Sequence, residues 1–226
     1  MSEEVVKFVN EIKNVMFAKC DIVVPHQDML DEFNNFMEHR TIDFVPFRTT
    51  EDNAKKYNLD VLSIVDQTND PRNGGNYTGG KKLTLKPQAT SLKPFFPKTL
   101  TWLRDTMPGI IRCKISRLPS TQVADFHHHP HRIPQLDGVF HIPLITNNGV
   151  RFHTRNREPG SPIKSCHFST GHLWWFNAED HIEHAVTNLG ATDRWHLWIN
   201  TRVLDTQYNC IGNDTLYNSL VNAEKF

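Results

Sequence analysis

A series of short runs rich in Ile, Val, Phe and Trp occupies the second half of the chain. These residue types are typical of β-strands, and the Pro, Gly, Asn and Asp residues between the runs are typical of turns. No helical stretch separates one run from the next, which disfavours a parallel sheet with helical crossovers. An antiparallel sandwich or barrel is therefore the expected architecture. The runs cover residues 111–118, 122–126, 138–144, 150–153, 165–168, 173–176, 183–188 and 195–201.

The remaining segments contain apolar residues at helical spacing. One stripe runs over 5–16, and a second over 30–37, with Asp28 as the expected N-cap of its helix. A third helix is expected over 98–107, because a proline and a glycine follow it. A short helix is expected around 214–223. Apolar stripes of this kind usually pack against a core, so we expect these helices to support the fold.

The length and charge of the chain limit its organisation and its partners. We expect one domain over 1–226: mostly helical and loop support over 1–109, a β-barrel core over 110–203, and a tail with a short helix over 204–226. Lys and Arg together number 25, as do Asp and Glu, so no net charge attracts polyanions. We therefore expect no nucleic-acid partner and no membrane partner.

The N-terminus and the cysteines indicate where the protein resides. The chain begins with an acidic segment that lacks the apolar run of a signal peptide. No later stretch approaches the ~20 apolar residues of a membrane span. The cysteines are dispersed and include no CxxC pair, unlike those of secreted disulfide scaffolds. We expect a cytoplasmic protein with reduced thiols.

A cluster of histidines ends one of the strand-like runs and includes His127, His128 and His129. Alternate residues of a strand point the same way, so His127 and His129 can converge on one ion while His128 faces away. His184, in a distant run, can bring a further ligand. Imidazoles suit iron, zinc or copper, and three facial ligands that leave positions open are typical of non-haem Fe(II) oxygenases.

Two other segments are candidates for covering such a site. The polar, glycine-rich segment 69–82 is either a surface excursion or a lid that keeps water out. The aromatic segment 174–177 is either part of the core or part of a substrate wall.

Four motifs in the second half appear in a characteristic order: RLPSTQVADFH, FHIPLITN, GHLWWFN, and HAVTNLG followed by RWHLWIN. Together they resemble the aspartyl/asparaginyl β-hydroxylase family, including its L-proline cis-hydroxylase relatives. The resemblance covers roughly 97–203, and the earlier residues show no comparable match. The family consists of Fe(II)- and 2-oxoglutarate-dependent dioxygenases. The resemblance thus implies a mainly β, double-stranded β-helix (a cupin-like jelly-roll) with supporting N-terminal helices.

The resemblance also assigns roles to individual residues. His127 matches the proximal iron ligand, and His184 matches the distal one. Arg194 matches the basic residue that pairs with the distal carboxylate of 2-oxoglutarate, a role that suits a guanidinium fork. His141 matches a histidine that lies against the same cosubstrate, and Ser116 matches a serine that contacts it in some members.

Two positions depart from the family pattern. His129 stands where many members have an acidic residue and others have glycine. It either completes a three-His site with His127 and His184, or stands aside with water in its place. Val139 stands where the family usually has a basic residue, so one cosubstrate contact is missing or is supplied elsewhere, for example by Arg132.

The resemblance implies an Fe(II)- and 2-oxoglutarate-dependent dioxygenase that uses O2, hydroxylates an amino acid or an amino-acid side chain, and releases succinate and CO2. The implied substrate is a small molecule, either a free amino acid or a peptide side chain.

Three alternatives to this function stay open. The first is a three-His cupin dioxygenase that does not use 2-oxoglutarate, which leaves Arg194 unexplained. The second is a non-catalytic metal- or ligand-binding barrel that has lost the chemistry. The third, a structural zinc site, is disfavoured because no cysteine accompanies the histidines.

Overall fold

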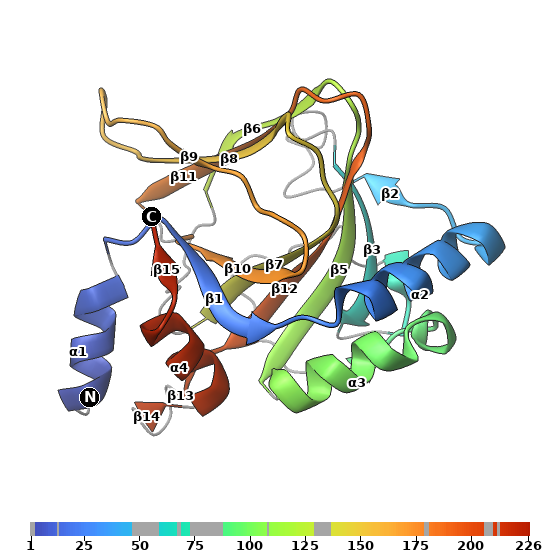
Figure 1. Ribbon diagram of the computed structural model, residues 1–226, viewed down its shortest axis with the longest axis horizontal. Coiled ribbons are helices and arrows are strands. Elements are labelled where there is room, and N and C mark those ends of the chain that lie inside the picture. Colours follow the sequence, from blue (N-terminus) through green and yellow to red (C-terminus); the bar gives the residue numbers. More distant parts are fainter. Residues whose placement is uncertain are drawn as a thin grey trace.

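The structure is a computed structural model, and it describes residues 3–12, 14–46, 59–66, 69–72, 88–107, 109–128, 137–178, 181–205, 210–211 and 213–226. Within these residues, a nine-stranded sheet and a four-stranded sheet face each other. Figure 1 shows the small sheet across the top of the view and the helices beneath the large sheet. The fold is a mainly β double-stranded β-helix of the jelly-roll type, as expected.

Eight consecutive strands form the barrel, and each corresponds to one of the predicted runs. Four of them lie in the large sheet in the order β10-β7-β12-β5, and four form the small sheet in the order β6-β11-β8-β9. All of these pairs are antiparallel. The strands are β5 (Ile110–Leu118), β6 (Gln122–His127), β7 (Asp137–Ile145), β8 (Val150–Asn156), β9 (Lys164–Cys166), β10 (His172–Phe176), β11 (Ile182–Asn188) and β12 (Arg194–Arg202).

Strands from the two ends of the chain widen the large sheet, and the sequence did not single them out. On one side, β1 (Phe17–Val23) pairs with β10, and β15 (Glu224–Lys225) pairs with β1. On the other side, β3 (Asp60–Asp66) pairs with β5. Short strands complete the set: β2 (Val45–Pro46) and β4 (Gln88–Ala89) pair with β3, and β13 (Leu204–Asp205) pairs with β14 (Cys210–Ile211).

The helices cover the outer face of the large sheet (Figure 1). Their apolar residues form one core cluster with the strand residues that point away from the barrel. None of the helices in the described ranges is long and apolar enough to cross a membrane. They are α1 (Glu3–Ile12), α2 (His26–His39), α3 (Pro97–Thr106) and α4 (Asp214–Val221), with a short 3-10 helix, η3 (Lys93–Phe95), before α3.

The prediction that Asp28 caps α2 is wrong. The N-cap is Pro25, whose fixed φ favours a helix start, and Asp28 lies in the first turn. The carboxylate that does cap a helix belongs to Glu32, which accepts hydrogen bonds from the backbone N–H groups of Lys98, at 2.5 Å, and Thr99, at 2.9 Å. These N–H groups lie in the first turn of α3 and have no partner within the helix, so the contact with Glu32 fixes α3 against α2.

Strand alternation sends different residue types to the two faces of the large sheet. On β12, Leu197 and Ile199 belong to the core beneath the helices. Arg194, His196 and Trp198, on the opposite face, line a cavity between the two sheets. The polar residues of β12 therefore point into the barrel, and this placement creates the candidate site.

Candidate active site

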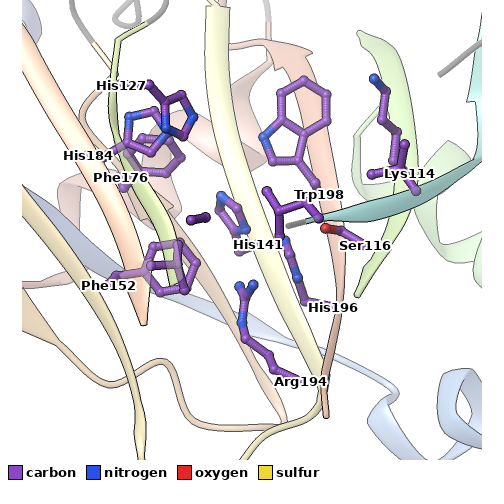
Figure 2. A pocket seen from close by; sticks show the side chains of 14 residues that line it. Lys114, Ser116, His127, His141, Phe152, Phe176, His184, Arg194, His196 and Trp198 are labelled. Atoms are coloured by element: carbon purple, nitrogen blue, oxygen red, sulfur yellow. The ribbon is translucent and has the colours of Figure 1, made fainter. Parts of the chain in front are cut away.

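His127, at the end of β6, and His184, on β11, lie side by side on the small sheet. They are direct register partners, and their ring centroids are 4.1 Å apart. A bulge in β6 between Ala124 and His127 turns both of these side chains into the barrel. Figure 2 shows the two imidazoles together at one end of the cavity. The structure thus brings the two predicted metal ligands together.

The hydrogen bonding of His127 suits metal binding. Its Nδ1 lies 2.8 Å from the carbonyl oxygen of Asp125. A carbonyl only accepts, so Nδ1 carries the proton and Nε2 carries the lone pair that a metal needs. Burial lowers the pKa of His127 from 6.5, which favours the neutral ring. Nε2 of His127 is therefore suited to a divalent metal.

The third predicted ligand, His129, lies outside the described residues. Within the described ranges, no group of three or more His, Cys, Asp and Glu side chains is placed to hold a metal ion. His127 and His184 thus supply two ligands, and the role of His129 stays a prediction.

Arg194 begins β12 and is buried, with 1% of its surface exposed. Its guanidinium lies over the ring of Phe152, with Cζ 4.6 Å from the ring centroid. Among the described residues, Nη2 has no hydrogen-bond partner and no carboxylate forms an ion pair with this side chain. Burial lowers the pKa of Arg194 to about 9, so the group is still a cation at neutral pH. A buried cation without a counter-charge favours an anionic ligand.

Two buried histidines lie near Arg194. His141, on β7, and His196, on β12, stack with their ring centroids 4.9 Å apart. Burial first, and the charge of Arg194 second, hold the pKa of both rings well below 6.5. Both imidazoles are therefore neutral at pH 7. The sequence predicted His141; it offered one signal for His196, namely its place two residues after Arg194, on the same strand face.

One cavity of about 60 Å³ connects these groups. Ser116, one of the predicted site residues, lines it from β5, and so does Lys114, which the sequence did not single out. Lys114 is 5% exposed, and its Nζ lies 5.4 Å from the ring centroid of Trp198. Figure 2 shows His141 near the middle, Arg194 below it, and Lys114 on the side opposite the histidine pair.

Of the aromatic segment 174–177, Phe176 lines the cavity. Trp175 points to the opposite face of β10 and packs in the core beneath the helices. Trp174 shares the face of Phe176 but packs against Phe168, with ring centroids 4.7 Å apart. The alternation of the strand thus divides this aromatic run between two cores.

The sequence matches no protein-family model and no curated protein. Solved structures are similar at low identity. A 2OG-Fe(II) oxygenase family oxidoreductase from Burkholderia pseudomallei has 16% identity and a TM-score of 0.56, covering 88% of this chain and 91% of that chain. A Trichoplax adhaerens prolyl hydroxylase, in complex with a hypoxia inducible factor peptide, has 10% identity and a TM-score of 0.54, covering 88% and 89%. The epimerase SnoN, from nogalamycin biosynthesis, has 8% identity and a TM-score of 0.53, covering 88% and 84%.

The chain has the fold of 2OG-Fe(II) oxygenases. Val139 is fully buried in the apolar core of the barrel, and its side chain offers no hydrogen-bond donor. Arg132, the suggested replacement, lies outside the described residues, as does most of segment 69–82, the surface excursion or candidate lid.

Two of the described residues that line the cavity have positively charged side chains. Its described lining includes Arg194 and Lys114 and contains no aspartate or glutamate. In a dry interior such charges act strongly, because water does not screen them. The arrangement therefore favours an anion that lies between the buried guanidinium and the histidine pair.

Proposed function

We propose that the protein is an Fe(II)- and 2-oxoglutarate-dependent dioxygenase that hydroxylates an amino acid or an amino-acid side chain and releases succinate and CO2. One observation carries the proposal: the His127–His184 pair and the buried Arg194 line the same cavity. The similar fold of SnoN, solved with Fe3+ and alpha-ketoglutarate, supports the same cofactors.

In this proposal, His127 and His184 hold the iron through imidazole nitrogens, and His129 is the third ligand. Bound iron supplies the activation of O2 and the oxidation of a substrate C–H bond. Burial favours the neutral ring of His127, and the Asp125 carbonyl holds its proton on Nδ1, which leaves Nε2 for the metal. The paired strands hold the two rings at a constant separation.

The cosubstrate would lie along the cavity, with its distal carboxylate on Arg194. A guanidinium fork forms two parallel hydrogen bonds to a carboxylate, which fixes its orientation as well as its position. Ser116 and His141 line the same space and supply further polar contacts. A dianionic cosubstrate would offset most of the positive charge of the buried guanidinium and the metal.

The substrate would enter on the side of Lys114 and Trp198. The ammonium of Lys114 suits the carboxylate of an amino acid or of an acidic side chain, and the indole of Trp198 offers an apolar face beside it. Leu59 and Val61 also line the cavity. These contacts favour a compact, anionic substrate, which agrees with a free amino acid.

Turnover tests this proposal. The protein should be incubated with Fe(II), ascorbate, O2 and 2-oxoglutarate, and succinate should be measured by mass spectrometry across a panel of free amino acids and short peptides. We expect slow succinate formation alone and faster formation with the proper substrate. O2 consumption without 2-oxoglutarate would instead support a three-His cupin dioxygenase. Metal binding without any turnover would leave the non-catalytic barrel.

A further inference from the structure

His196 has a position that the proposed cosubstrate site leaves unexplained. It is the cross-strand partner of Ser116 and lies two residues along β12 from Arg194. Its side chain lines the cavity, is 3% exposed, and stacks on His141. A polar ring this deeply buried usually has a partner for each polar atom.

The hydrogen bonds of His196 are incomplete. One ring nitrogen is hydrogen-bonded to the backbone of Ser116, a contact that raises the pKa of His196 and therefore uses a ring N–H. Nδ1 has no hydrogen-bond partner among the described residues. In the neutral ring, the proton thus lies on Nε2 and the lone pair on Nδ1. A lone pair cannot donate a hydrogen bond to a carboxylate.

We propose that His196 is a second anion-binding residue of this pocket, and that its Nδ1 takes up one proton from solvent when a dicarboxylate binds beside Arg194. The inference rests on the proposed function, since the dicarboxylate that the site would hold is 2-oxoglutarate. His196 would thereby supply a contact that Val139 cannot make.

His141 differs from its stacked neighbour in a way that assigns the proton to His196. Among the described residues, neither ring nitrogen of His141 has a hydrogen-bond partner. A neutral His141 can therefore direct its single N–H at the ligand without gaining a proton. His196 already uses its N–H on Ser116, so it becomes a donor to the ligand only as an imidazolium.

The charges around His196 explain why the proton arrives with the anion. The other charged and titratable groups that line the cavity are Arg194 on its own strand, His141 on β7, Lys114 on β5, and the histidine pair, His127 and His184, on the small sheet. Burial and Arg194 hold the pKa of His196 low while no anion is present. A carboxylate beside the ring offsets the charge of Arg194 and attracts a proton to Nδ1, so its binding raises the pKa of His196.

Isothermal titration of the Mn(II)-loaded protein with 2-oxoglutarate, without O2, measures the coupled proton directly. Titrations in buffers with different ionisation enthalpies give the number of protons taken up. We expect about one proton per 2-oxoglutarate at pH 7.5, and a Kd that rises about tenfold per pH unit between pH 7 and 8.

Three variants isolate the contribution of His196. His196→Gln keeps a neutral hydrogen-bond donor, so it should bind 2-oxoglutarate without proton uptake. His196→Leu removes the donor, so its Kd should rise about ten- to hundredfold. His153→Gln is the matched control: its ring hydrogen-bonds to Ser165 and Thr187 outside this cavity, and the variant should keep the wild-type proton uptake.

A second measurement needs no substitution. In Zn(II)-loaded protein with 15N-labelled histidine, addition of 2-oxoglutarate should convert one imidazole signal to that of an imidazolium. Binding without proton uptake, or equal uptake in His196→Gln and wild type, would overturn the role of His196 while leaving the proposed function standing. No binding of 2-oxoglutarate would overturn both. Proton-coupled binding without iron-dependent turnover would support His196 and remove the oxygenase activity.

Discussion

His127 and His184 are register partners on neighbouring antiparallel strands, with their ring centroids 4.1 Å apart. A ladder of backbone hydrogen bonds continues on both sides of β11, which pairs with β6 and β8. The histidine pair is thus held by the sheet rather than by a loop. A site built on paired strands keeps its geometry better than one built on loops.

The first prediction concerns this pair. His127→Ala and His184→Ala should each abolish stoichiometric binding of Mn(II) or Fe(II), because each variant removes one half of the histidine pair on which the site is built. Equilibrium dialysis with metal analysis measures the stoichiometry, and circular dichroism confirms that each variant is folded. His153→Ala, on the same small sheet, is the control and should bind as wild type. Full binding by both cavity variants would rule out the site.

The second prediction concerns His129. If His129 is the third ligand, His129→Ala should weaken Mn(II) binding. His128→Ala is the matched control, because the neighbouring side chain is expected to face away from the ion and its loss should change nothing. Competition with a fluorescent chelator gives both affinities. Equal affinities of the two variants and wild type would identify a two-His site.

The third prediction concerns Arg194. Arg194→Ala should weaken 2-oxoglutarate binding by roughly 2 to 5 kcal/mol, since the carboxylate would lose a buried, charge-assisted pair. Metal binding should stay intact. Arg194→Lys retains the charge without the guanidinium fork, so its affinity for 2-oxoglutarate should lie between those of wild type and Arg194→Ala. Isothermal titration measures all three, and an unchanged affinity in Arg194→Ala would mean that another residue holds the carboxylate.

The buried histidines predict acid sensitivity. The pKa of His141 and His196 lies well below 6.5 in the folded state, so below about pH 6.5 the unfolded chain binds more protons than the folded one. The free energy of unfolding should therefore decrease as the pH is lowered below 6.5, by up to about 1.4 kcal/mol per pH unit for each histidine. Urea unfolding at pH 7.5 and 5.5 measures the loss, which should be smaller in His196→Leu. Equal stability at the two pH values would contradict the buried, neutral rings.

Much of the barrel could be predicted because its signals are local. Seven of its eight strands, all except β9, carry β-branched or aromatic residues, and the order of the motifs located His127, His184 and Arg194. By contrast, β1 lies between two helical stripes, and β3 was also missed. Both strands are defined by long-range pairing with β10 and β5, which no short window of sequence reveals.

The same reasoning explains the missed site residues. Lys114 and His196 are polar residues that alternate with apolar residues along their strands, and such polar residues often face solvent. Their direction becomes known only when the large sheet is placed between the helices and the small sheet. Fold topology therefore identifies these residues as part of the cavity, whereas composition and spacing do not.

A crystal structure with Mn(II) and 2-oxoglutarate tests the central claim most directly, since it locates both ligands at once. The account predicts one ion bound by His127 and His184, with metal–nitrogen distances of about 2.0 to 2.2 Å. It also predicts the distal carboxylate of 2-oxoglutarate on the guanidinium of Arg194, with both ligands in the same cavity. An ion bound away from the histidine pair, or a cosubstrate that leaves Arg194 without its carboxylate, would contradict the account.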